Sequence, residues 1–289
     1  MSDLPDLIPL DEARRLVLDG IDALPAVTVD LADAAGLALA EPVRSALTLP
    51  PWPNSAMDGF AVRAVDVAEA SAERPAVLRV LGEVPAGRAP DDEVGPGTAL
   101  RIMTGAMMPA GADTVVPVED TDAPAGASEV PAAVAVLAPT RLGGNVRLPG
   151  SDVAAGTPLL ERGRVLDPAA IALLAATGHA AVRVHRRPRV AVISTGDELV
   201  PPGQPLGPAQ IHECNSFTLA AQAAEAGAEV RRMGIAADTL PDLLALLREA
   251  VAWGDVVVLS GGVSVGAHDH VKAAFSGIGQ LDVWRVAIK

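Results

Sequence analysis

Carboxylates occur in the segments that follow three stretches of the chain predicted to be strands of one sheet. They are Glu198, Asp238 and Asp269. Because parallel strands end at the same edge of their sheet, these side chains are expected to converge there. Neighbouring anions need a cation, and carboxylates with phosphate oxygens are the ligands that Mg²⁺ prefers. The spacing predicts a magnesium site; taken singly, Asp238 would also suit a helix N-cap and Glu198 a solvated loop.

A glycine-rich loop follows the last of these strands. Gly261, Gly262 and Gly266 leave backbone N–H groups free to approach a phosphate without side-chain obstruction. The loop matches neither a P-loop nor a G-x-G-x-x-G pattern, and a tight turn at a strand end would use the same residues. His268 and His270 lack the further ligands that a zinc site needs. The loop therefore favours a phosphate-bearing ligand, with a simple turn as the alternative.

Two polar segments interrupt a region of otherwise apolar, β-type sequence. They cover residues 54–63, which include Asp58, and residues 103–106, which include Thr104. Each segment taken by itself is typical of a turn, because Asn, Asp, Ser and Gly favour turn conformations. Their polarity nevertheless marks them as candidates for a site.

The carboxylates need a parallel sheet to bring them together, and the last third of the chain alternates in the way that builds one. The pattern predicts a helix over 216–226, a second helix over 239–251 capped by Asp238, and strands over 190–194, 229–235 and 255–260. This βαβαβ order predicts a doubly wound α/β domain with its ligand crevice beyond the carboxyl ends of the strands.

The preceding part of the chain is predicted to be β-rich. Short strands separated by Gly and Pro are expected at 77–81, 99–103, 114–118 and 134–137, which suits a small domain such as a barrel. Helices are expected at 9–22, 31–35 and 167–178. We predict a multidomain α/β plus β fold, with a linking domain (1–50 and 138–185), an inserted β-rich domain (51–137) and the α/β domain (186–289).

Composition excludes several classes of function. The net charge of −14 repels nucleic acid and anionic lipid, so we expect neither as a partner. No apolar run approaches the roughly 18 residues of a membrane span, and the N-terminus lacks a signal-peptide pattern. Cys214 is the single cysteine, which excludes an internal disulfide and predicts a buried, small hydrophobic residue. A cytosolic protein is expected.

Five motifs in order and spacing resemble the molybdopterin molybdenumtransferase family, the molybdenum-insertion enzymes of molybdenum cofactor synthesis that are related to the insertase domain of gephyrin. They are residues 54–63, 101–106, 194–199, 260–266 with Asp269, and 287–289. The resemblance implies conversion of adenylylated molybdopterin and molybdate into molybdenum-bound molybdopterin and AMP, with Mg²⁺. It also implies an elongated homodimer whose active sites join the α/β domain of one subunit to the β-rich domain of the other.

The resemblance also implies roles for individual residues. Asp238 and Asp269 would bind Mg²⁺, in agreement with the strand-end argument. Catalytic positions would be Glu198 and Lys289, with Asp58 and Thr104 contributed by the partner subunit. Substrate-binding positions would be Asp152, Thr195, Gly196, Asp197, Gly261, Gly262, Ser264, Gly266 and Arg285.

The sequence departs from the family pattern in places. Arg285 stands where many relatives carry Lys, and His212-Glu213-Cys214-Asn215 replaces a more usual Tyr-Asp-(Ser/Thr)-Asn, which puts local substrate contacts in question. The Lys-Pro-Gly-Lys-Pro run that Lys289 would open, and the segments after it, are not in this sequence. We therefore expect the chain alone to bind its ligands weakly and not to insert molybdenum.

Two other functions stay open at this point. A shortened, non-catalytic module could bind molybdopterin or a nucleotide as a dimer, but a scaffold has no need for clustered carboxylates. A nucleotide-processing enzyme could share the α/β domain, but residues 54–63 and the inserted domain argue against it. A dehydrogenase of the Rossmann type lacks its glycine fingerprint.

Overall fold

The computed structural model describes residues 7–126, 128–261, 270–276, 278–279 and 286–287. The chain divides into two compact units. The first unit comprises residues Met1–Glu41, Arg162–Pro168 and Ala181–Lys289, and the second comprises Pro42–Glu161 and Ala169–Ala180. The three domain boundaries expected from the sequence stay a prediction.

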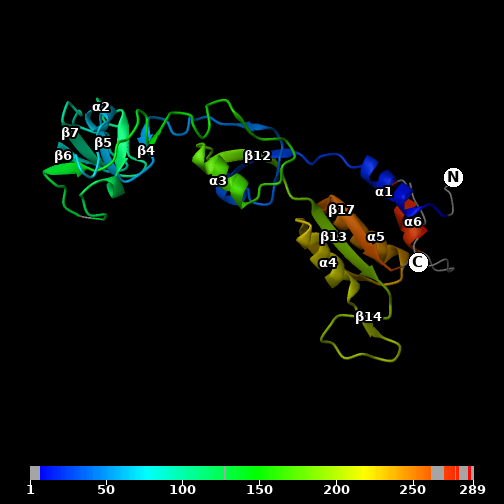
Figure 1. The fold of residues 1–289 in the computed structure, drawn as a ribbon. Helices are drawn as coiled ribbons and strands as arrows, with labels where there is room; N and C mark the ends of the chain where they lie inside the picture. The colour runs from blue at the N-terminus through cyan, green and yellow to red at the C-terminus, as the bar shows by residue number, and fades with distance from the viewer. Residues whose placement is uncertain (1–6, 127, 262–269, 277, 280–285, 288–289) are drawn as a thin grey trace. The chain divides into compact units, whose positions relative to one another are not determined.

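A parallel sheet forms the centre of the α/β part of the first unit, as the alternating pattern predicts. β13 is the middle strand and pairs in parallel with β16 on one side and β17 on the other. Figure 1 shows α4 and α5 beside these strands. The elements are β13 (Arg189–Thr195), β14 (Leu199–Val200), β15 (Ile211–His212), α4 (Asn215–Glu225), β16 (Glu229–Ala236), α5 (Leu240–Trp253), β17 (Val256–Ser260) and α6 (His270–Ser276).

The two faces of β13 have different partners. Ala191 and Ile193 point into an apolar core formed with α5 and α6. Because side chains alternate along a strand, Ser194 points to the other face, where its hydroxyl donates to Glu213, just before α4. The sheet is therefore covered on both faces, which a parallel sheet requires.

A short parallel pair that the sequence pattern did not predict lies after β13. Leu199 pairs with Ile211 and Val200 with His212 to form β14–β15, with residues 201–210 between the two strands. This pair connects the end of β13 to the start of α4, so it shapes the carboxyl edge of the sheet.

A second, antiparallel sheet in the first unit joins distant parts of the chain in the order β1-β12-β2. The expected helix at 31–35 is wrong, because only a 3-10 turn forms there before the chain reverses at Gly36, which has a φ of 74°. The elements are α1 (Leu10–Asp19), β1 (Ala26–Asp30), η1 (Leu31–Asp33), β2 (Ala38–Leu39) and β12 (Ala181–His185).

A five-stranded mixed sheet dominates the second unit, in the order β8-β5-β7-β6-β9. Only β6 and β7 are parallel to each other among its recorded pairs. The elements of the sheet are β5 (Gly59–Val62), β6 (Ala76–Val84), β7 (Thr98–Ile102), β8 (Thr114–Pro117) and β9 (Ala133–Val136). The described strands form an open sheet with β8 and β9 at its two edges. Their pairing therefore does not close into the barrel suggested by the sequence.

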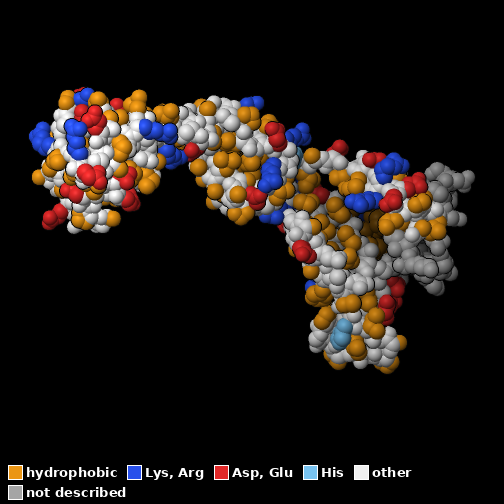
Figure 2. All heavy atoms as spheres, viewed as in Figure 1, with side chains coloured by type: hydrophobic (Ala, Val, Ile, Leu, Met, Phe, Trp, Pro, Cys, Tyr) orange, Lys and Arg blue, Asp and Glu red, His pale blue; other side chains and the backbone are white. Residues whose placement is uncertain are grey.

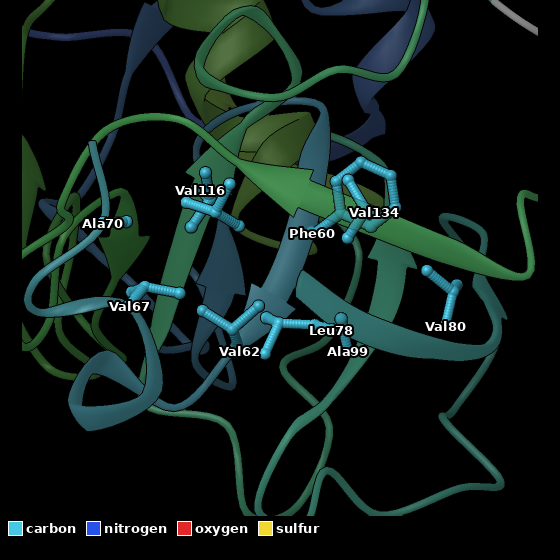
Figure 3. Close-up of a cluster of buried hydrophobic side chains, with 10 residues drawn as sticks. Phe60, Val62, Val67, Ala70, Leu78, Val80, Ala99, Val116 and Val134 are labelled. Atoms are coloured by element: carbon cyan, nitrogen blue, oxygen red, sulfur yellow. The ribbon is translucent and has the colours of Figure 1, made fainter. Parts of the chain in front are cut away.

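Both faces of the five-stranded sheet are buried. Phe60 and Val62 point into one core with Val116 and Leu78, as Figure 3 shows. The residue between them, Ala61, points into a second core on the opposite face. This explains why β5 is buried along its whole length.

Shorter elements complete the second unit. They are β3 (Val43–Arg44), β4 (Asn54–Ser55), α2 (Ala64–Val67), η2 (Val118–Asp120), β10 (Val146–Arg147) and β11 (Pro158–Leu160). The helix α3 (Pro168–Ala176) begins at the boundary between the units and confirms the helix expected after Asp167.

The described surface carries mixed chemistry. Acidic, basic and apolar side chains are interspersed over the face seen in Figure 2, so the net charge of −14 is not gathered into one patch there. In the part of the chain that the structure describes, no helix is long and apolar enough to cross a bilayer.

Candidate functional site

Three predicted site residues meet at the carboxyl end of β13. The Thr195 hydroxyl donates to Asp238 Oδ1 over 2.8 Å, and the Asp238 backbone N–H donates to Asp197 Oδ1 over 3.0 Å. Thr195 is buried, whereas both carboxylates are exposed. The strand ends therefore bring these residues together as the sequence predicts, in an oxygen-rich, negatively charged corner.

Asp238 does not cap the helix that follows it, so that expectation is wrong. Thr239 is the N-cap of α5, and its hydroxyl oxygen accepts from the backbone N–H of Asp242 over 3.3 Å. Since Thr195 donates to Asp238 instead, the Asp238 carboxylate faces the end of the sheet. Asp238 therefore has no capping role that would account for its position.

Glu198 lies close to the turn at Gly196. A side-chain carbon built on Gly196 would come within 2.5 Å of Glu198 Oε2, so a side chain at 196 would have to displace the Glu198 carboxylate. The Leu199 N–H donates to the Gly196 carbonyl over 3.1 Å and closes the turn. Glu198 is exposed and therefore accessible to a ligand.

The first residue of the glycine-rich loop requires glycine. Gly261 has a φ of 106°, and a side-chain carbon there would be 2.4 Å from the Thr195 carbonyl oxygen. Close approach of Gly261 to the end of β13 is thus a structural reason for this glycine. The other predicted residues of this part of the site lie outside the described residues: Gly262, Ser264, Gly266, Asp269, Arg285 and Lys289.

A cavity of about 460 Å³ opens beside this corner, within the size range of small-molecule sites. It extends from the end of β13 across the last residues of β16 to the start of α4. Gly196 and Asp197 are the predicted site residues in its wall. The described lining residues are Gly196, Asp197, Leu199, Pro201, Pro202, Glu213, Ser216, Arg232, Gly234, Ile235, Ala236 and Ala237.

Glu213 is a buried carboxylate in the cavity wall that sequence reasoning noted only as a departure from a family pattern. It accepts from the Ser194 hydroxyl over 3.0 Å and from the Ser216 backbone N–H and hydroxyl, each over 2.6 Å. Burial acts to raise the pKa of Glu213, but these hydrogen bonds and the nearby Arg232 hold it below its ordinary value. The signal in the sequence was a charged residue two positions before the start of α4.

Cys214, the next residue, is exposed, so the expectation of a buried thiol is wrong. Glu213 and Ser216 take the buried positions at the start of α4 and leave Cys214 outside. Its Sγ contacts only the Asn215 side chain among the recorded hydrogen bonds, over 3.7 Å.

Asp58 and Thr104, the catalytic candidates of the second unit, form a pair. Asp58 Oδ1 accepts from the Thr104 backbone N–H over 2.6 Å and from its hydroxyl over 2.8 Å. The backbone N–H first, and then the hydroxyl, hold the pKa of Asp58 below its ordinary value. The adjacent Gly59 has no room for a side chain, because a carbon there would be 2.0 Å from the Val116 carbonyl oxygen. The turns at residues 54–63 and 103–106, which were predicted separately, are thus joined by these hydrogen bonds.

Asp152 forms an exposed ion pair with Arg147, and its backbone N–H donates to the Leu49 carbonyl over 3.0 Å. It belongs to the same compact unit as Asp58 and Thr104. Arg147 lies on β10, opposite Asn54 on β4. The polar segment 103–106 also contacts β4, because the Ser55 N–H donates to the Ala106 carbonyl over 3.0 Å.

The described residues contain no group of three or more His, Cys, Asp and Glu side chains that could hold a metal ion. Asp269, the second predicted magnesium ligand, lies outside them. The magnesium site therefore stays a prediction, and Asp238 is the part of it that can be located.

Two family models match the chain and together cover most of it. Residues 8–178 match a family described as the MoeA N-terminal region (domain I and II), and residues 191–289 match a probable molybdopterin binding domain. A molybdopterin molybdenumtransferase of Haemophilus influenzae is 36% identical over 98% of this chain and 68% of its own length. The chain belongs to the MoeA family of molybdopterin molybdenumtransferases.

Other members of the MoeA family agree with this assignment. Molybdopterin molybdenumtransferase 2 of Mycobacterium tuberculosis is 44% identical over 92% of this chain, and the chain spans 64% of that relative's length. The crystal structure of a molybdopterin biosynthesis MoeA protein from Pyrococcus horikosii superposes with a TM-score of 0.80 at 37% identity, covering 98% of this chain and 70% of the other. The family and the multidomain α/β plus β fold predicted from the sequence are confirmed.

Proposed function

We propose that the chain acts in molybdenum cofactor biosynthesis as a molybdopterin molybdenumtransferase. Its substrates would be adenylylated molybdopterin and molybdate, and its products molybdenum-bound molybdopterin and AMP. The observation that carries this proposal is the Thr195–Asp238–Asp197 network beside a cavity of ligand size, in the segment that matches a molybdopterin binding domain.

The chemistry of the strand-end corner suits a magnesium ion. Its side-chain donors are oxygen atoms only, and Mg²⁺ prefers one or two carboxylates together with phosphate oxygens and water. Asp238 would hold the ion with Asp269, and the bound ion would neutralise the phosphates of the substrate. Glu198 and Lys289 would act on the reacting groups, and Asp58 and Thr104 would complete the site.

We also propose that the protein works as a homodimer with composite active sites. The support on this chain is α1, whose residues Leu10, Val17 and Leu18 are all more than half exposed, as is Ile21 just after it. Exposed apolar side chains gathered on one short helix are typical of an interface. A second copy of the chain would cover them.

The proposed activity is tested by incubating the 289-residue chain with adenylylated molybdopterin, Mg²⁺ and molybdate. We expect this chain to bind adenylylated molybdopterin saturably but weakly, and Asp238→Asn to weaken that binding further. We expect molybdate-dependent release of AMP from a protein that spans the full length of the relatives. Without binding, the proposal fails for this site. Binding with no molybdate-dependent release, even when extended versions of the chain are assayed, would instead identify a non-catalytic binding module.

A further inference from the structure

Arg232 is a cation in the cavity wall to which neither the sequence motifs nor the family resemblance assigns a role. It lies on β16, and its guanidinium is restrained from two directions. Its Nε donates to the Ser216 hydroxyl oxygen over 3.0 Å, and its Cζ lies 3.3 Å from the centroid of the Phe217 ring. Stacking and one hydrogen bond fix the plane of the guanidinium, and its terminal nitrogens have no recorded acceptor among the described residues.

The hydrogen bonds that hold Arg232 run in sequence from Arg232 to Ser216 and from Ser216 to Glu213. The Ser216 hydroxyl has a single hydrogen, which it donates to Glu213 Oε2 over 2.6 Å. Its oxygen is therefore free to accept from Arg232. Glu213 Oε1 already accepts from Ser194 and from the Ser216 backbone, so Glu213 is occupied by internal donors and serves to hold Ser216 and, through it, Arg232.

The pairing of β16 with β13 is irregular beside Arg232. The register between β13 and β16 shifts after Val192↔Arg232, so that Ile193 pairs with Gly234 and Met233 is left over as a bulge. Bulges re-aim neighbouring side chains and are common next to binding sites. Gly234 has a φ of 111°, and a side-chain carbon there would meet nothing within 4 Å, so the cavity wall is open at this point.

We propose that Arg232 is the anion-binding residue of this cavity, that it binds a phosphate group of the ligand, and that Glu213 is its positioning residue. Arg232 is the one cation among the described lining residues, in a protein whose net charge of −14 otherwise repels phosphate. Guanidinium suits this task because it binds phosphate oxygens with two parallel hydrogen bonds. The proposal rests on the proposed function only for the identity of the natural ligand, a phosphorylated pterin or its adenylate.

Calorimetry on the full chain with AMP, adenosine and inorganic phosphate tests the anion contact. We expect AMP to bind more tightly than adenosine, and Arg232→Gln to weaken AMP and phosphate about tenfold or more while leaving adenosine unchanged. Arg231→Gln is the matched control: it removes the same charge from the adjacent residue, which stacks on Trp253 with its Cζ 4.5 Å from the ring centroid. Equal losses in both variants would show a general charge effect and overturn the proposal, as would failure of AMP and phosphate to bind at millimolar concentration.

A double-mutant cycle tests the role of Glu213. Glu213→Gln keeps the size of the side chain but cannot accept all three donors, so we expect AMP binding to weaken several-fold in the parent and not to weaken further in Arg232→Gln. Additive losses would contradict positioning through Arg232, because independent sites add. If Glu213→Gln does not fold, Ser216→Ala interrupts the same link and enters the same cycle.

These outcomes are separable from the proposed function. Arg232-dependent AMP binding would leave the phosphate subsite standing even if no molybdate-dependent AMP release occurs. The transferase would be contradicted if release is also missing from a protein that spans the full length of the relatives. Release of AMP that is unaffected by Arg232→Gln at subsaturating substrate would support the transferase and contradict the phosphate subsite.

Discussion

At the scale of single residues, the Asp58–Thr104 pair keeps a carboxylate ionised on the surface of the second unit. The backbone N–H and the hydroxyl of Thr104 both donate to Asp58, and its pKa lies below the ordinary value. A carboxylate whose pKa is lower in the folded than in the unfolded state stabilises the fold above the unfolded pKa. That contribution disappears as the pH falls through the folded pKa, so it is fully present at neutral pH.

Thr104→Val should raise the pKa of Asp58 toward its ordinary value, because the hydroxyl donor is lost while the backbone N–H remains. Thr104→Ser keeps the hydroxyl and should leave the pKa near that of the parent. Carboxyl chemical shifts followed by NMR across the acidic range measure both variants. If Thr104→Val and the parent titrate together, the hydroxyl does not stabilise the charged form.

At the scale of elements, the identity of the N-cap of α5 decides what Asp238 is free to do. The Thr239 hydroxyl accepts from the Asp242 N–H and donates to the Asp242 carboxylate over 2.7 Å, so the cap is linked twice to the first turn of α5. Pro241 in the first turn has no N–H to satisfy and favours the helical φ. Because Thr239 caps α5 without Asp238, the Asp238 carboxylate is available at the end of the sheet.

Thr239→Ala should therefore lower the free energy of unfolding by about 1 kcal/mol, the usual cost of losing an N-cap side chain. Thr239→Ser retains the capping hydroxyl and should cost much less. Urea unfolding followed by circular dichroism compares the two variants with the parent. Equal losses for Ser and Ala would argue that the methyl group of Thr239, which both variants lack, and not its hydroxyl, stabilises this end of α5.

At the scale of the whole molecule, the proposed dimer predicts complementation between damaged subunits. Asp58→Ala and Glu198→Ala each damage a different half of a composite site. Random pairing of equal amounts should restore about one quarter of the sites, because half of the dimers are mixed and each has one intact site. Adenylylated molybdopterin binding, measured after the two proteins are mixed and re-equilibrated, reports the recovery.

A mixture of Asp58→Ala with Thr104→Ala is the matched control. Both changes lie in the same unit, so every site of the mixed dimer stays damaged and no recovery is expected. Recovery in neither mixture would mean that each subunit builds its own site or that the protein does not exchange subunits, and light scattering of the parent distinguishes a monomer from a dimer. A monomer would contradict the composite site.

The sequence by itself determined the main helices and strands of the α/β domain and the motifs that identify the family, although not the short pair β14–β15 or the 3-10 turn at 31–33. Period-two and helical patterns located β13, β16, β17, α4 and α5, and the rule that parallel strands end together placed Glu198 after β13 and Asp238 after β16 at one edge. These predictions succeeded because local propensity and burial both act over a few neighbouring residues. The family followed from five motifs in order, and the matches over residues 8–178 and 191–289 confirm it.

Only the tertiary structure decided which of these polar groups are partners. Asp58 and Thr104 are 46 residues apart, and Glu213 is 19 residues from Ser194, so no local pattern could pair them. The same holds for the cap of α5, where Thr195 competes successfully for Asp238 from 43 residues away. The bulge at Met233 and the position of Arg232 likewise depend on the register between two strands. Hydrogen bonds between distant residues depend on how the chain packs, and packing is a property of the whole domain that spacing along the sequence does not contain.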